Sequence, residues 1–457
     1  MIVQTNRTLG RKKYMLSILG FLMIFTFLFL ILTKRVSPFL GLTVIPIIYG
    51  VIGGFGPELG VLMMEGIQKV APTAILLLFA ILYFGIMLDT GLFDPLTSKI
   101  IQLAKGDPLK IIVGTAVLAG IIGFDGDGST TMMIVVTAFL PLYKKLGISP
   151  IILASITIMQ IGITTLVPWG GPAGRVASVL NLEPNQLYLE MLPGMIVSLL
   201  FVIAVAYFIG LKERARYRKT SSETISMSEG IVDAAIESAV IENISPENQN
   251  VKRPKLIWFN LFLSSIIMVA IVLEWLPSAI VFIVGTALAL LINYPALQNQ
   301  RERMAAHAPN ALAVVAVVLA AGIFSGIFKG TPISESMAQS LVSIIPDGLG
   351  AYMALFTAIV SGPALFLIGA DGFYFGILPI LAETASNYGI GSLKIGTASL
   401  YGTPFGIMGP LVASVYLLIN ITGINLGDLH KHAAKWSLGI MLIYIIVGVF
   451  TGIIALW

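Results

Sequence analysis

Aspartate residues interrupt apolar stretches at matching places in the two halves of the chain, as a pair in the first half and singly in the second. The pair lies in the run Gly-Phe-Asp-Gly-Asp-Gly at residues 123–128, and the single aspartate lies in Ile-Gly-Ala-Asp-Gly at residues 368–372. A charged side chain at bilayer depth is costly, so it usually has a function there. Gly-interrupted apolar segments that recur in both halves are typical of binding sites in secondary transporters. We therefore expect Asp125, Asp127 and Asp371 to bind a coupling cation, a proton or a metal carried by the substrate.

Three hydroxyl side chains follow the first pair of aspartates. Ser129, Thr130 and Thr131 would stand at the start of a half-helix, after a turn that the glycines at 126 and 128 permit because glycine tolerates positive φ. Free N–H groups and the positive end of the helix dipole attract anions at such a position. We interpret this tip as a carboxylate-binding site. A capped turn outside the membrane is the alternative, since Asp and Ser are common helix caps.

A second break follows at residues 164–175, which read Thr-Thr-Leu-Val-Pro-Trp-Gly-Gly-Pro-Ala-Gly-Arg. Two prolines and three glycines are not expected within an unbroken helix. Arg175 could bind a carboxylate bidentately, or it could be a cytoplasmic anchor that snorkels to the interface. The corresponding segment of the second half, residues 402–410, has the same helix breakers but fewer polar groups.

These four segments supply the predicted substrate-binding residues. They are Gly126, Asp127, Gly128, Ser129, Thr130, Thr131, Thr165, Pro168, Gly170, Gly171, Arg175, Asp371, Gly372, Thr403 and Pro404.

The composition is that of a polytopic membrane protein. Of the 457 residues, 57% are hydrophobic and only 11% are charged, whereas soluble domains carry about a quarter charged residues. A spanning helix needs about 20 apolar residues, and the apolar pieces at 132–142 and 373–382 are shorter. We predict that these two are arms of re-entrant hairpins, because irregular backbone at membrane depth must be buried or line a cavity. The expected fold is all-α, with hairpins and broken helices.

A polar segment at residues 212–253 divides the chain into membrane repeats at 1–211 and 254–457. Basic residues at both of its edges predict a cytoplasmic linker, and the basic start of the chain predicts a cytoplasmic N-terminus. The C-terminus is then expected outside. The glycine at 85 precedes Asp127 by 42 residues, and the glycine at 326 precedes Asp371 by 45. This agreement in spacing predicts two inverted repeats.

Other side chains suggest no further chemistry. The chain has no cysteine, which excludes thiol catalysis and cysteine metal sites. His307, His430 and His432 are interpreted as topology residues in polar loops, and Asp89 as an interface cap. No soluble domain and no nucleic-acid motif are visible, so the lipid bilayer is an expected partner and nucleic acid is not.

The same motifs resemble the citrate–metal–proton symporter family. The residues that carry the resemblance are Gly-Asp-Gly-Ser-Thr-Thr at 126–131, Pro-Trp-Gly-Gly-Pro at 168–172 with Arg175, Lys-Gly-Asp-Pro-Leu-Lys at 105–110, and the stretches 69–87 and 371–383. The resemblance implies a fold of the elevator type, usually a homodimer, with a mobile transport domain. It also implies proton-driven uptake of citrate complexed with Mg²⁺ or Ca²⁺, with no permanently bound cofactor and no enzymatic activity.

The sequence departs from the family at two places. Ala370 stands where the family usually has Asn, and the segment 405–409 lacks the family's His and Ser. Another small organic acid, coupled to H⁺ or Na⁺, is therefore the first alternative cargo.

Two alternatives belong to other functional classes. An intramembrane aspartyl protease could use Asp127 and Asp371 as a dyad, but residues 124–127 lack the first glycine of the Gly-x-Gly-Asp hallmark. A channel would not need two balanced halves, and no filter-like repeat is present. We expect a transporter.

Overall fold

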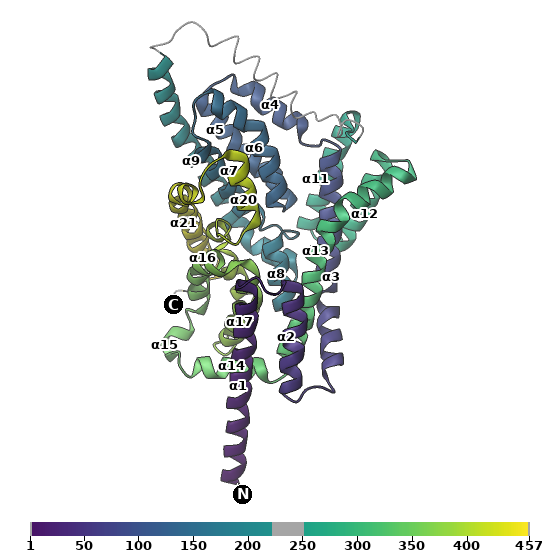
Figure 1. Ribbon diagram of the computed structural model, residues 1–457, viewed down its shortest axis with the longest axis vertical. Coiled ribbons are helices and arrows are strands. Elements are labelled where there is room, and N and C mark those ends of the chain that lie inside the picture. The colour runs from purple at the N-terminus through teal and green to yellow at the C-terminus, as the bar shows by residue number, and fades with distance from the viewer. Residues whose placement is uncertain (1, 222–250, 456–457) are drawn as a thin grey trace.

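The computed structural model describes residues 2–221 and 251–455, and within these ranges every regular element is helical (Figure 1). The first half consists of α1 (Ile2–Leu32), α2 (Pro38–Ile52), α3 (Leu59–Asp89), α4 (Asp94–Ala104), α5 (Pro108–Ile122), η1 (Gly123–Asp125), α6 (Gly128–Lys145), α7 (Pro150–Thr164), α8 (Gly171–Leu180) and α9 (Pro184–Ser221). The second half begins with η3 (Pro254–Leu256), α11 (Ile257–Val272), α12 (Ser278–Asn293), α13 (Leu297–Gly330), α14 (Ile333–Val342) and α15 (Asp347–Gly350). It continues with α16 (Met353–Asp371), the π-helix η4 (Gly372–Ile377), α17 (Leu378–Ser386), α18 (Ser392–Leu400), α19 (Thr403–Gly406), α20 (Ala413–Thr422) and α21 (Leu426–Phe450).

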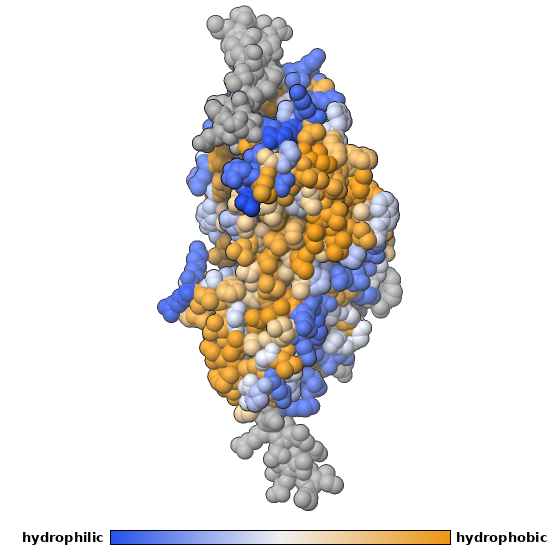
Figure 2. Space-filling view, turned by 90° about the vertical axis from the view of Figure 1, so that its right-hand side faces the viewer, coloured by the Kyte–Doolittle hydropathy of each residue, from blue (hydrophilic) through white to orange (hydrophobic). Residues whose placement is uncertain are grey.

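The outer helices present apolar side chains to their surroundings. Among the described residues, eight helices are long and apolar enough to cross a membrane. Phe25 on α1 and Phe262 on α11 are about two-thirds exposed, and Figure 2 shows broad apolar areas on one face of the molecule. Such surface is stable against lipid, so the multi-pass membrane protein expected from composition is confirmed.

Two helical hairpins have their tips at a cavity inside the molecule. In the first, α5 and α6 pack side by side and are joined by η1, Gly126 with φ +83° and Asp127. In the second, α16 bends at Gly369, where φ is +75°, and passes through η4 into α17. Positive φ favours glycine, and π-turns often occur at functional sites. Each predicted short arm is part of one of these hairpins, so the predicted hairpins are confirmed.

Two helices are broken where the sequence predicts breaks. α7 ends at Thr164 and α8 begins at Gly171, so residues 165–170 form a turn. In the second half, residues 401–412 separate α18 from α20 and contain only the short α19. Proline and glycine cause both interruptions, because they cannot continue the helical hydrogen-bond ladder without cost.

The long helices α3 and α13 hold the two halves together. Gly66 of α3 and Gly322 of α13 lie against each other's backbone, and a Cβ added at Gly66 would overlap the carbonyl oxygen of Gly322. Gly326 lies in the same way against the carbonyl of Leu62. Small residues at a helix interface allow this close approach within a membrane.

The structure corrects the predicted orientation of the termini. We call the side that carries the end of α9 and the start of α5 the linker face. There, Arg216 donates a hydrogen bond to the carbonyl of Gly147 at 3.0 Å. Ser17 near the start of α1 instead bonds Ser340 of α14 at 2.8 Å, and Figure 1 places the start of α1 at the end of the molecule away from the end of α9. The N-terminus and the linker edge therefore cannot both be cytoplasmic, as the sequence analysis predicted.

An odd number of crossings explains this difference. In the first half, α1, α2, α3, the broken pair α7–α8 and α9 make five passes if the α5–α6 hairpin is counted as entering and leaving on one side, and five is an odd number. α21 runs antiparallel to α9, with Tyr444 near Gly194 and Phe201 near Gly439. Both ends of the chain thus lie opposite the linker face, and the prediction of termini on opposite sides is also wrong.

The edges of the predicted linker are ordered. α9 continues through residues 212–221, which the sequence analysis assigned to the linker. On the other side, the Arg253 backbone N–H bonds the carbonyl of Thr90 at 3.0 Å, and its Nε donates to the carbonyl of Asn293 at 2.7 Å. The rest of the predicted linker, residues 222–250, lies outside the described residues.

An ion pair on the linker face gives a test of this packing. Burial alone would raise the pKa of Asp107, but the hydrogen bond and charge of Arg214, with the N–H of Leu109, outweigh burial and hold that pKa below its ordinary value. At pH values above the ordinary carboxyl pKa, the ionised Asp107 side chain stabilises the folded protein. This stabilisation is lost as the pH falls through the pKa of Asp107 in the folded state.

We therefore expect Asp107→Asn to lower the melting temperature at neutral pH and to have a diminishing effect as the pH falls below about 4. Asn caps helices about as well as Asp, so the capping bond to Leu109 is kept. Melting curves of the purified protein at several pH values measure this, and an effect of the same size at every pH would contradict it.

Candidate functional site

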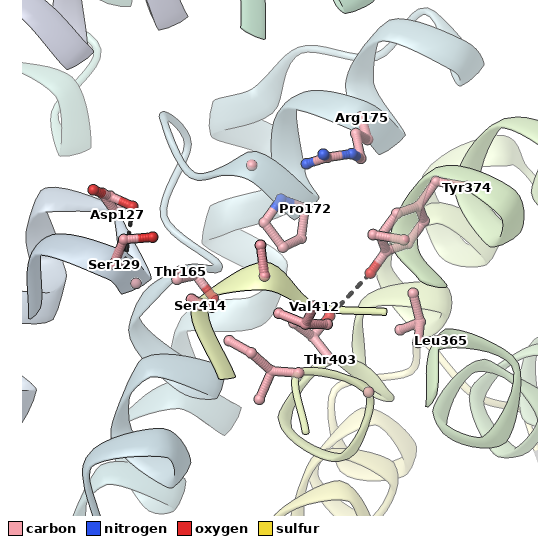
Figure 3. Close-up of a pocket in the computed structure, with 17 residues that line it drawn as sticks. Asp127, Ser129, Thr165, Pro172, Arg175, Leu365, Tyr374, Thr403, Val412 and Ser414 are labelled. Carbon is pink, nitrogen blue, oxygen red and sulfur yellow. Dashed lines mark hydrogen bonds between the residues drawn. The ribbon is translucent and has the colours of Figure 1, made fainter. Parts of the chain in front are cut away.

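A cavity of about 340 Å³ lies where the two halves meet, and we call it the central cavity (Figure 3). It is lined by both hairpin tips and both helix breaks. Its lining residues are Gly126, Asp127, Gly128, Ser129, Thr165, Gly171, Pro172, Arg175, Leu365, Ala370, Tyr374, Thr403, Gly406, Ile407, Val412, Ala413 and Ser414. The structure thus brings together eight of the predicted site residues, namely Gly126, Asp127, Gly128, Ser129, Thr165, Gly171, Arg175 and Thr403.

Asp127 caps α6 and lines the cavity at the same time. Its Oδ1 accepts from the Ser129 N–H at 3.0 Å, and its Oδ2 accepts from the Thr130 N–H at 3.2 Å. The capping role considered from the sequence is therefore present. The tip is nevertheless inside the molecule, because the cavity beside it is lined by residues of both halves.

Arg175 links the two halves across the cavity wall. Its Nε donates to Asp371 Oδ1 at 2.7 Å, and both side chains are roughly 30% exposed. A Cβ added at Gly171 would lie 2.8 Å from Nη1, so the absence of a side chain there makes room for the guanidinium. Arg175 is therefore not a snorkelling anchor at the membrane surface.

The second half adds hydroxyl groups that the site prediction omitted. The Tyr374 hydroxyl lies 3.0 Å from Thr403 Oγ1, and the Ser414 side chain points into the same space in Figure 3. Tyr374 follows Asp371 by three residues in the sequence, and this closeness to the second tip could have predicted that Tyr374 belongs to the site. Ser414 stands beyond the break at the start of α20, and nothing in its local sequence indicates its place.

The remaining predicted residues shape the site without lining this cavity. Asp371 lies behind Arg175, while Thr130 lines a second cavity. Thr131 is buried and donates to the carbonyl of Asp127 at 3.1 Å. Gly170 closes the turn of the first break, because its N–H donates to the carbonyl of Val167 at 2.8 Å, and Pro168 lies within this turn. In the second half, Pro404 lies against Gly162, and Gly372 lies against Ile368.

Gly126 gives a test of the tip geometry. A Cβ at this position would lie 2.9 Å from Trp169 Cδ1, and φ is +83°. We expect Gly126→Ala to destabilise the protein by about 1–2 kcal/mol, the usual cost of left-handed backbone for a residue with Cβ, and to weaken substrate binding because the tip shifts. Thermal unfolding with and without ligand measures both effects. Gly147→Ala, also at positive φ but with open space around its Cβ, is the matched control for strain alone.

A second cavity of about 550 Å³ lies on the other side of the first tip, and we call it the linker-side cavity. Gly126, Asp127, Ser129 and Gly171 line both cavities. Asp125 lines the second one and is only 7% exposed. Its Oδ1 accepts from the Asp127 N–H at 2.8 Å, whereas Oδ2 has no hydrogen-bond partner among the described residues.

The histidines are not in polar loops, so their sequence interpretation is corrected. His307 lies within α13, lines the linker-side cavity and bonds Asp89 Oδ2 through Nε2 at 2.8 Å. His430 and His432 lie within α21, where they contact the Met408 carbonyl and Ser155 Oγ at 2.8 and 2.9 Å. Apolar flanks on one helical face were the missed signal, since they allow a helix to continue through a polar patch.

The acidic residues do not form a resident metal centre. Within the described part of the chain, no three His or carboxylate side chains gather as a metal-binding group. Asp125 and Asp127 share the first tip, while Asp371 is engaged by Arg175. This arrangement is not the carboxyl dyad of an aspartyl protease, because Asp371 bonds a guanidinium.

Comparison with known proteins agrees with this picture. The family model described as "Citrate transporter" matches residues 27–402. A Bacillus subtilis (strain 168) protein named "Citrate transporter" is 47% identical over 96% of this chain and its own full length. A second B. subtilis relative, named "Mg(2+)/citrate complex secondary transporter", is 43% identical over 97% of this chain and its own full length.

A solved structure shows the same fold. The Alcanivorax borkumensis YdaH transporter, whose structure is described as having an unusual topology, superposes with a TM-score of 0.58 over 95% of this chain and 98% of its own, at 13% identity. The predicted all-helical transporter fold is confirmed by this likeness. The matched family and relatives are transporters and not enzymes. By family model and by relatives, the chain belongs to the citrate transporter family.

Proposed function

We propose that the protein is a proton-coupled symporter that takes up citrate complexed with a divalent cation, Mg²⁺ or Ca²⁺. The observation that carries the proposal is the mixed polarity of the central cavity. Arg175 and the hydroxyl-bearing side chains of Ser129, Thr165 and Thr403 line the same cavity as Asp127, and Figure 3 shows Asp127 and Arg175 on opposite sides of it. A ligand with both anionic and cationic groups fits such a cavity better than a simple anion does.

The chemistry of the complex supports this assignment. Citrate that chelates a divalent ion carries less net charge than free citrate, so less free energy is needed to remove it from water. Mg²⁺ prefers oxygen ligands and keeps several of its waters, and Asp127 can accept hydrogen bonds from those waters. Arg175 can bind a carboxylate through charge-assisted hydrogen bonds. The ion is then cargo, and no permanently bound cofactor is required.

We further propose that the linker face is cytoplasmic. Basic residues are frequent there, and cytoplasmic loops carry an excess of Lys and Arg. Those near the hairpin, the end of α9 and the start of α11 are Lys105, Lys110, Lys144, Lys145, Arg214, Arg216, Lys252, Arg253 and Lys255. Both chain ends would then lie outside.

The proposed working unit is a homodimer of chains built from repeats at 1–211 and 254–457. The glycine contacts of α3 and α13 would belong to a fixed scaffold, while the hairpins and broken helices would form a moving transport domain. This elevator arrangement and the dimer rest on the family resemblance.

One observation favours a second cargo. Ala370 lines the central cavity at a position where an amide would add both a donor and an acceptor. A smaller organic acid, coupled to H⁺ or Na⁺, would need fewer polar partners on that side.

Uptake of labelled citrate into proteoliposomes tests the proposal. Uptake should require Mg²⁺ or Ca²⁺ outside and an inward proton gradient, and it should collapse when a protonophore or a chelator is added. A sodium gradient without a proton gradient is the matched control. Citrate uptake independent of metal would overturn the metal-complex assignment, and uptake driven by Na⁺ alone would overturn proton coupling.

A further inference from the structure

The linker-side cavity is a continuation of the substrate site toward the linker face. Its wall toward the central cavity is the first hairpin tip, and the opposite wall comes from α3 and α13. The residues of α13 that line it, His307, Asn310, Ala313 and Val314, lie between the first third and the middle of that helix, which begins on the linker face. A ligand leaving the central cavity past the tip would therefore enter this space before it reached the linker face.

The two walls of this cavity differ in charge. The tip wall carries the Asp127 carboxylate and the buried side chain of Asp125, whose Oδ2 is enclosed and lacks a hydrogen-bond partner among the described residues. The opposite wall, from α3 and α13, carries the His307 imidazole and the Asn310 amide. The amide can donate hydrogen bonds to a carboxylate, and the imidazole, whose Nε2 is engaged by Asp89, can donate from Nδ1 when both ring nitrogens carry a proton. One wall thus suits a hydrated divalent ion, and the other suits an anion.

The position of His307 is fixed by its neighbours. Its Nε2 lies 2.8 Å from Asp89 Oδ2, and Arg303 Nη1 lies 3.3 Å from the same oxygen. On the α3 side the ring lies against Gly85, where an added Cβ would come within 2.5 Å of the ring atom Nδ1. The hydrogen bond between Nε2 and the Asp89 carboxylate, which accepts it, fixes the orientation of the ring and the position of Nδ1. Gly85 therefore makes the room in which the ring is held.

We propose that the linker-side cavity is a second binding station for the metal–carboxylate complex, in which Asn310 and the doubly protonated His307 ring bind a carboxylate and Asp127 faces the metal and its waters, with the buried Asp125 adding negative charge beside it. This inference rests on the proposed function, because it takes the same complex as its ligand. It adds a site that the complex occupies on its way between the central cavity and the linker face.

Transport measured separately from each face tests this station. Apparent KM for Mg²⁺–citrate would be measured in oriented proteoliposomes, from the linker face and from the opposite face. We expect His307→Ala to raise KM at the linker face about tenfold, because a hydrogen bond to a charged group is worth about 1.5–3 kcal/mol. KM at the opposite face should change by less than about twofold, since His307 does not line the central cavity.

Two further variants test the same station even if the His307→Ala protein does not fold. Asn310→Ala should give the same one-sided rise, and Gly85→Ala should reproduce it by displacing the ring without changing its chemistry. Gln298→Ala, an exposed residue of α13 that bonds Glu302, is the matched control and should leave both KM values unchanged.

The outcomes separate the two proposals. A one-sided rise in KM for the folded variants supports the second station. Equal changes at both faces, or no change, would overturn it while leaving metal–citrate transport intact. Absence of metal–citrate transport by the wild-type protein would overturn the proposed function and the second station together.

Discussion

Asp127→Asn should reduce citrate uptake to the level of empty liposomes while the protein stays folded in the membrane. Asp127 lines both cavities, so its carboxylate is the one acidic group on the wall that they share. Asparagine removes the negative charge that would face the metal and its waters. It keeps an oxygen that can accept from the backbone of Ser129 and Thr130, and Asn caps helices about as well as Asp.

Two readouts distinguish a lost function from a lost fold. The melting temperature of Asp127→Asn should match that of the wild type within a few degrees, and labelled uptake should be absent. Asp428→Asn changes an exposed carboxylate in the first turn of α21, away from the cavities, and should transport normally. Normal uptake by Asp127→Asn would remove this carboxylate from the mechanism.

Arg175→Lys should weaken the apparent affinity for citrate by about tenfold or more, because the site loses charge-assisted hydrogen bonds worth about 1.5–3 kcal/mol. Lysine keeps the charge but not the planar fork. The 2.7 Å bond from Nε to Asp371 depends on that fork, so the second tip should also lose its fixed position. Equilibrium binding of the metal–citrate complex to the purified variant measures the change.

Coupling with Asp371 shows which role of Arg175 dominates. If the arginine acts mainly by holding the second tip, Asp371→Asn should weaken binding to a similar degree and the double variant should add little. If it acts mainly on the ligand, Asp371→Asn should have the smaller effect. Arg301→Lys, at an exposed position of α13, serves as the control. An unchanged affinity for citrate in Arg175→Lys would show that Arg175 has a structural role only.

Local sequence predicted the interrupted elements well. The Asp-Gly-Asp-Gly run needs a tight turn, and Gly126 adopts the positive φ that only glycine accepts cheaply. Prolines and glycines around Trp169 cannot continue a helix, and α7 and α8 are separated there. In these cases the physical cause lies within a few neighbouring residues, so the sequence alone contains it.

Contacts between distant segments could not be predicted in the same way. The bond between Arg175 and Asp371 joins residues 196 positions apart, and Ser414 reaches the cavity only because α20 begins beside α6. His307 looked like a loop residue because charged neighbours surround it in sequence. In the fold those neighbours lie along α13, and the packing of α13 against the apolar helix α3 determines which side chains of α13 are buried.

The orientation of the chain ends was predicted wrongly for a related reason. A charge rule counts basic residues near each end, and the start of the chain and the linker edges are both basic. The actual side of each end depends on how many helices cross. The total number of crossings required knowledge that each hairpin returns to its own face.

The glycine contact between α3 and α13 also bears on how the two halves stay associated. Gly66 precedes the linker and Gly322 and Gly326 follow it, yet their backbones touch directly. The covalent connection between the halves is then not what keeps them in register. Two separately synthesised polypeptides, one ending after α9 and one beginning before α11, would carry complementary surfaces for this contact and could reassemble into a working carrier within the bilayer.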